Sequence, residues 1–259
     1  MTSLRSAVLV PLVESDAVRK AQSAIALDAN LPVDAGAVIA APARIPGRPL
    51  MPELVPHSRL EQRSVATAEG RAALIHSIAH IELNAIDLAL DIVWRFPGMP
   101  DAFYRDWAGV AKEEAKHFTL LRDHLVSIGS DYGAFQAHNG LWEMAEKTDG
   151  DLLARIALVP RTLEARGLDA SPMVKKKLVS VGDHKAGAIL DLILREEIGH
   201  VAVGNRWYRY LCAARGLDPV ATYAELSDRY KAPHLRGPFN LEARRAAGFD
   251  EEELAALGR

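Results

Sequence analysis

The sequence predicts an all-α fold organised around four long helices. Apolar residues recur with the period of an α-helix between Pro and Gly stops, and no segment alternates as a strand would. Hydrophobic residues make up 49% of the 259 residues and charged residues 25%, which allows one large core. We therefore expect one large domain with appendages at its two ends.

Residues 1–60 are expected to form an arm that packs on this domain. Residues 16–27 have the pattern of an amphipathic helix with Val18, Ala21 and Ile25 on one side. Five prolines follow within fifteen residues, and they favour an extended segment along the surface (Pro42, Pro46, Pro49, Pro52 and Pro56). The apolar run at residues 7–13 is short and lacks a small-residue cleavage site, so it is interpreted as mature chain.

The central domain, residues 61–216, is expected to contain the four long helices. Their predicted ranges are 64–96, 101–127, 149 or 151–167, and 183–214. The stops between them include Pro97-Gly98, Gly129 and Gly216. Short helices are expected at residues 141–147 and from Ser171-Pro172, where a cap residue precedes a proline. Residues 217–259 are expected to form a tail of short helices, interrupted by Pro233, Gly237 and Pro238.

Carboxylates interrupt the apolar side of each long helix. Glu82 lies in the middle of one stripe, among Ile75, Ile78, Ala79, Ala85, Ile86, Ala89 and Val93. The apolar stripes of the other three predicted helices are interrupted in the same way by Glu114, Glu164 and Glu197. A buried carboxylate is costly unless it is protonated, paired or bound to a metal. Four converging carboxylates therefore suggest cations between them.

The spacing of these acids repeats. Glu114 follows Glu82 by 32 residues, and Glu197 follows Glu164 by 33. Each second acid begins a Glu-x-x-His motif that ends at His117 or His200, and residues three apart share a helix face. Two such halves in a four-helix bundle would form a two-metal carboxylate site. The alternative is a set of buried ion pairs or protonated acids without metal.

On these motifs the chain resembles the ferritin-like di-iron carboxylate superfamily over residues 64–215. The runs HIELNAID (80–87), EEAKHF (113–118) and EEIGHV (196–201) are similar to an uncharacterised bacterial family of ferritin-like proteins, as are GLWEMAE (140–146) and PFN (238–240). The EAR run at 164–166 is similar to the third helix of tRNA-modifying di-iron hydroxylases. The resemblance implies a ferritin-like four-helix bundle.

The resemblance also implies two iron ions held by six ligands, namely Glu82, Glu114, His117, Glu164, Glu197 and His200. Manganese suits the same ligands. Spacing favours Glu114 and Glu197 over the adjacent Glu113 and Glu196, whose roles stay open. Pro160, one turn before Glu164, is expected to kink the third helix.

The opposite side of the first helix reads as solvated. It carries His76, Ser77, His80, Asn84, Asp87 and Asp91, so its histidines are expected to face water. His124 is expected to be structural. Asp87 and Asp183 are candidates to orient the ligand histidines.

Three functions fit a site of this kind. The first is an oxygen-activating oxidoreductase of the hydroxylase or oxygenase type, with dioxygen, a small or tRNA-like substrate and an electron-donor protein as partners. The second is an iron-binding protein of the ferroxidase type. The arm and the tail would have to fit outside the bundle, which argues against assembly into a cage. The third is an interaction module that metals stabilise.

Composition bears on the expected binding partners and on the cellular location. A net charge of −3 does not point to nucleic acid, and the clusters at 175–177 and 206–236 are interpreted as solvated charge. A single cysteine, Cys212, indicates a reducing compartment, so a cytoplasmic location is expected. No transmembrane helix is expected, and a homodimer is an open alternative.

Overall fold

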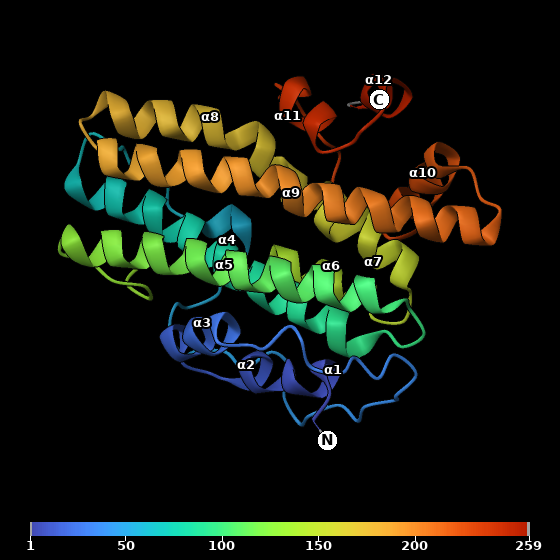
Figure 1. The fold of residues 1–259 in the computed structure, drawn as a ribbon. Coiled ribbons are helices and arrows are strands. Elements are labelled where there is room, and N and C mark those ends of the chain that lie inside the picture. The colour runs from blue at the N-terminus through green and yellow to red at the C-terminus, as the bar shows by residue number, and fades with distance from the viewer. Residues whose placement is uncertain (1, 258–259) are drawn as a thin grey trace. The chain divides into compact units, whose positions relative to one another are not determined.

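The computed structural model describes residues 2–257, which form two compact helical units. Of these residues, one unit comprises 2–140 with 181–189, and the other comprises 141–180 with 190–257. The helices are drawn in order in Figure 1. The all-α class is confirmed for the described residues, whose one pairing outside helices is an isolated bridge between Leu54 and Ala137. The division into residues 1–60, 61–216 and 217–259 stays a prediction.

A hairpin of two long helices forms the centre of the first unit. Helix α4 (Ala68–Arg95) and helix α5 (Asp101–Ser127) pack along their lengths (Figure 1). Thr67 caps the start of α4 by accepting a hydrogen bond from the Gly70 amide at 3.0 Å. Gly129 ends α5 with a φ of +82°, a conformation that glycine adopts without steric cost. The predicted bounds of α5 are confirmed.

Three short helices of the arm pack on this hairpin. They are α1 (Leu4–Ala7), α2 (Leu9–Val13) and α3 (Ala17–Ile25). Arg5 is fully buried, and its guanidinium donates to the carbonyls of Val93 and Trp94 at 3.1 and 2.7 Å. The last carbonyls of a helix have no partner within it, so Arg5 supplies donors that the end of α4 lacks.

The expected buried side of α3 was partly wrong. Its buried residues are Ala17, Lys20, Ala21 and Ala24, whereas Ile25 is 42% exposed. The buried Lys20 pairs with Asp87 of α4 and also donates to the Leu12 carbonyl at 3.2 Å. The side of α3 that faces α4 is therefore chosen by an ion pair as well as by apolar residues.

The expectation of a solvated side on α4 was wrong for every residue of that side except Ser77, which is exposed. His76, His80, Asn84, Asp87 and Asp91 are all buried. The proline-rich segment, with the 3-10 turn η1 (His57–Arg59), and the loop after α5 supply partners to this side. The loop residue Tyr132 lies 2.8 Å from His80 Nδ1, and its ring stacks on His76. The polar residues of α4 therefore line a second buried interface.

We expect both histidines to stay neutral well below pH 6.5. Burial lowers the pKa of His76 to about 4. Burial also lowers the pKa of His80 to about 4, although its hydrogen bond with the His138 carbonyl opposes this shift. As the pH falls below about 6.5, these histidines bind protons in the unfolded chain but not yet in the folded protein. Protons therefore favour the unfolded chain, and the free energy of unfolding decreases as the pH falls from about 6.5 to 4. Asp87 acts in the opposite direction in part of this range.

The ring resonances in an NMR pH titration report these histidines individually. The exposed His184 and His234 are the controls. Titration of His76 or His80 near pH 6.5 would contradict the buried interface.

The second unit departs from the predicted third helix. Helix α6 (Gly140–Lys147) precedes α7 (Leu152–Leu158), a π-helical segment η2 (Val159–Glu164) and α8 (Ala165–Ser180). The helical path runs through Gly167, where a stop was expected, and Pro172 lies inside α8 rather than starting a helix. Pro160 lacks an amide hydrogen and falls in the π-helical segment, which accommodates the missing bond. This segment passes Gly204, where a Cβ would lie 3.3 Å from Pro160 Cβ.

Three short helices complete the second unit, namely α10 (Pro219–Arg229), α11 (Leu241–Ala246) and α12 (Glu251–Ala256). Helix α10 packs on α7, and α11 packs on α8. An apolar cluster joins Ala165 and Leu168 to Val201, Phe249 and Leu254. The expected tail of short helices is confirmed, and it belongs to the core of this unit.

Helix α9 (His184–Arg215) begins in the first unit and continues in the second. Asp183 precedes it and accepts from the Ala186 amide at 3.0 Å, which caps the helix. The same carboxylate lies 3.0 Å from His124 Nε2 of α5. Asp183 therefore contacts a structural histidine and not a candidate ligand, and Asp87 contacts Lys20, so neither has the orienting role that the sequence suggested.

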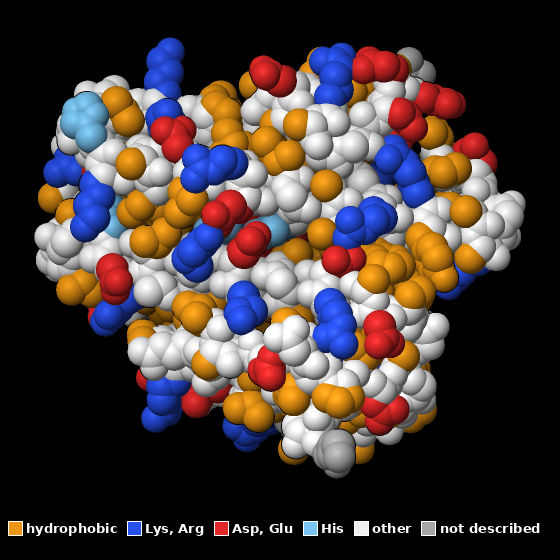
Figure 2. Space-filling model, in the orientation of Figure 1, with side chains coloured by type: hydrophobic (Ala, Val, Ile, Leu, Met, Phe, Trp, Pro, Cys, Tyr) orange, Lys and Arg blue, Asp and Glu red, His pale blue; other side chains and the backbone are white. Residues whose placement is uncertain are grey.

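By length and composition alone, α4 could cross a membrane, but 72% of its most apolar window is buried inside the protein. Burial of this kind is typical of a core helix. On the face drawn in Figure 2, basic and acidic side chains are interspersed, without a large field of one sign among the described residues.

Candidate metal centre

Three candidate ligands of the first unit meet between α4 and α5. His117 Nδ1 lies 3.0 Å from Glu82 Oε2 and 3.4 Å from Glu114 Oε2. Each residue offers one ligand atom, and these atoms lie within 4.8 Å of one another. All three side chains are buried. We call Glu82, Glu114 and His117 the buried triad.

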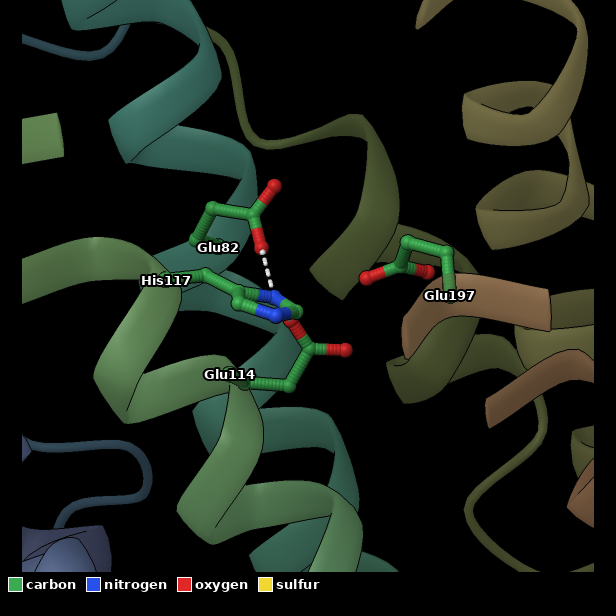
Figure 3. A group of neighbouring side chains, drawn as sticks. All are labelled: Glu82, Glu114, His117 and Glu197. Carbon is green, nitrogen blue, oxygen red and sulfur yellow. Dashed lines mark hydrogen bonds and ion pairs between the residues drawn. The ribbon is translucent and has the colours of Figure 1, made fainter. Parts of the chain in front are cut away.

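The helices bring the triad together for simple reasons. Glu114 and His117 are three residues apart, so they share one face of α5. Glu82 lies on the side of α4 that packs against this face (Figure 3). The apolar residues around Glu82, including Ile75, Ala79 and Ile86, are buried, so the stripe that packs the hairpin also buries the acid.

The triad has more acid than base. Burial lowers the pKa of His117, but the hydrogen bonds and charges of Glu114 and Glu82 outweigh burial and raise the pKa to about 11. Even a protonated imidazole balances only one of the two carboxylates. The triad could hold a divalent cation, because carboxylate and imidazole are ligands for iron, manganese and zinc.

The second Glu-x-x-His motif has the same local geometry within the second unit. His200 Nδ1 lies 3.3 Å from Glu197 Oε1, and both residues are buried. The corresponding distance in the first motif is 3.4 Å. In each motif the Nδ1 nitrogen faces the carboxylate one turn earlier. Figure 3 draws the triad with Glu197.

Comparisons with known proteins identify an uncharacterised family. Residues 13–255 match the family model described as a protein of unknown function, DUF455. The chain belongs to this family. It is 49% identical to an uncharacterized protein of Haemophilus influenzae over 213 residues, which cover 80% of this chain and 74% of that protein. No solved structure matches the chain.

The other acids of the DUF455 chain occupy different environments. Glu164 is half-buried at the end of the π-helical segment in the second unit. Glu113 is exposed and Glu196 is half-buried, whereas their neighbours Glu114 and Glu197 are buried. In each Glu-Glu pair, the more buried residue is therefore the one that spacing favoured as a ligand.

Sequence reasoning missed the partners of the polar side of α4. The signal for them was present, because His76, His80, Asn84, Asp87 and Asp91 recur every three or four residues. Such a stripe lies on one face of a helix whether water or protein covers it. The cover comes from residues 20, 48 and 132, which are distant in sequence.

Proposed function

We propose that this DUF455 protein is a di-iron carboxylate protein and an oxygen-activating oxidoreductase of the hydroxylase or oxygenase type. The buried triad would bind metal together with Glu164, Glu197 and His200 of the second unit. Manganese is the alternative metal, because carboxylate and imidazole ligands suit both.

The observation that carries the proposal is the pair of buried carboxylates on one imidazole. Glu82 and Glu114 both contact His117, and all three side chains are buried. Buried charge of this kind is expensive without a counter-ion. The second motif repeats the Glu–His contact at 3.3 Å, which supports a second ion of the same kind.

The residues of the triad have distinct tasks in this proposal. Ligand atoms within 4.8 Å of one another can share an ion at roughly 2.0–2.5 Å from each. A bound di-iron pair would supply reduction of dioxygen and oxidation of a substrate. The carboxylates would fix the ions, and the apolar side chains around Glu82 would exclude water. Dioxygen, a small or tRNA-like substrate and an electron donor are the proposed partners.

Metal analysis tests the proposal directly. We expect protein loaded with ferrous iron under anaerobic conditions to retain about two ions per chain, and Glu114→Ala to lose most of them. Glu113→Ala is the matched control, because Glu113 is the adjacent exposed acid. It should retain the metal.

A second measurement examines the chemistry. Admission of oxygen to the ferrous protein should produce an absorption change in wild type and in Glu113→Ala, but not in Glu114→Ala. Wild-type protein that binds only traces of iron and manganese would contradict the metal centre. Two bound ions without any response to oxygen would contradict the oxidoreductase and leave a metal-stabilised protein.

A further inference from the structure

We propose that the second unit binds a small organic carboxylate in a cavity of about 640 Å³ beside α10, with Arg244 as the anchor. The cavity is lined by residues of α10, the segment after it, η2, α11, α12 and the α11–α12 connection. Every lining residue belongs to the second unit, and none is a candidate metal ligand. The proposal therefore does not depend on the metal centre.

The size and walls of the cavity suit a small molecule with an apolar body. Ligand pockets typically enclose about 300–1,000 Å³ and combine apolar walls with a few polar groups. Apolar side chains contribute much of this wall, including Val220, Leu235, Phe249 and Leu257.

Arg244 lines this cavity and carries a donor that has no partner within residues 2–257. Its guanidinium is fully buried and binds Asp169 through Nε and Nη2, at 3.0 and 2.7 Å. The ring of Phe249 lies 5.3 Å from the guanidinium carbon and helps to hold it in place. Nη1 is buried and has no hydrogen-bond partner among residues 2–257. An unpaired buried donor is costly, and a ligand carboxylate would satisfy it with a charge-assisted bond.

Ser227 adds a second open group on the α10 wall. Its Oγ is buried and also lacks a hydrogen-bond partner within the described chain. Both Ser227 and Arg244 line the cavity, and the proposed head group would bond to the hydroxyl as well as to the guanidinium. A carboxylate has two oxygens and accepts from both kinds of donor.

Charged side chains of both signs line the cavity. Arg161, Lys231 and Arg244 line it, against the acids Asp228 and Glu253. Glu253 is already engaged, because Arg161 and Arg209 both bind its carboxylate. Arg161 is thus paired with Glu253, and Arg244 is paired with Asp169, so the open Nη1 of Arg244 is the group that would favour an anion.

Calorimetric titration of the full-length protein with 3-phenylpropionate tests the proposal. A ligand of about ten heavy atoms should bind in the millimolar range or tighter. Its uncharged analogue, 3-phenylpropionamide, should bind about tenfold more weakly, because it lacks the charge that Arg244 recognises. Phenyl phosphate tests the other common anionic head group and should bind more weakly than the carboxylate.

Variants locate the binding in this cavity. Ala224→Trp places a large ring on the exposed part of the α10 wall and should abolish binding of the acid. Ala221→Trp is the matched control, since Ala221 is an exposed residue of α10 that does not line the cavity, and it should bind like wild type. Arg244→Lys keeps a cation beside Asp169 but removes the Nη1 donor, so the acid should lose part of its advantage over the amide.

Three outcomes would overturn the proposal. They are binding of the amide as tightly as the acid in wild type, unchanged binding in Ala224→Trp, and no binding of the acid at millimolar concentration. Tighter binding of phenyl phosphate would overturn the carboxylate assignment. If Arg244→Lys fails to fold, the acid–amide preference of wild type and the two Trp variants still decide the question.

Discussion

Replacing Lys20 with methionine should lower the free energy of unfolding by about 3–5 kcal/mol. The Lys20 side chain is 0% exposed and that of Asp87 is 4% exposed, so their ion pair is shielded from water. Removal of one partner of a buried pair leaves an uncompensated charge, and this loss exceeds the net value of the pair itself. Urea denaturation followed by circular dichroism measures the change.

The double variant Lys20→Met with Asp87→Leu is the control for this prediction. It removes both charges and should recover most of the lost stability, because an apolar pair of similar volume often replaces a buried ion pair without cost. If Lys20→Met lowers the free energy of unfolding by less than about 1 kcal/mol, the ion pair is no stronger than one on the surface. That result would contradict the buried interface.

The effect of Lys20→Met should also depend on pH. Burial raises the pKa of Asp87 to about 6, although the Lys20 ammonium opposes the shift. Without Lys20 the pKa of Asp87 rises further, so the variant carries a protonated Asp87 in acid and a costly carboxylate at higher pH. Because the folded pKa lies above the unfolded value, stability falls as the pH rises through it. The deficit of the variant should therefore grow from pH 5 to pH 8 as measured by urea denaturation.

The sequence was most informative where a helix has one apolar stripe and is bounded by a proline or glycine at each end. Helix α5 has an apolar face, a proline before it and Gly129 after it, and its bounds matched the structure. Burial of Glu82 and Glu114 followed from their positions on such stripes. Their contact with His117 followed from helical spacing and a short connection.

The sequence was least informative where a second layer covers a polar stripe. A helix pattern shows which residues share a side but not whether protein lies over that side. Asp87 is buried because Lys20, 67 positions earlier, supplies a counter-charge. The π-helical segment was missed for a related reason, since the packing of Pro160 against Gly204 spans 44 positions.

Replacing Glu82 with leucine should have opposite effects on the metal-free and the metal-loaded protein. Glu82 is one of two buried carboxylates that contact His117, so its removal takes one acid from a site that holds two acids and one imidazole. The metal-free variant should be as stable as wild type, or more stable by up to about 4 kcal/mol, because a buried charge has been replaced by an apolar side chain.

The loaded variant should lose what the metal contributes. Binding to the folded state alone stabilises a protein, and this gain grows with the concentration of free ligand relative to its dissociation constant. Addition of ferrous or manganous ion should therefore raise the midpoint of urea unfolding in wild type and in Glu113→Leu, but not in Glu82→Leu. With chelator present the order should reverse, with Glu82→Leu equal to or above the other two. Unfolding of metal-free Glu82→Leu at clearly lower urea than metal-free wild type would mean that Glu82 is held by structural pairing, and that its burial does not depend on a cation.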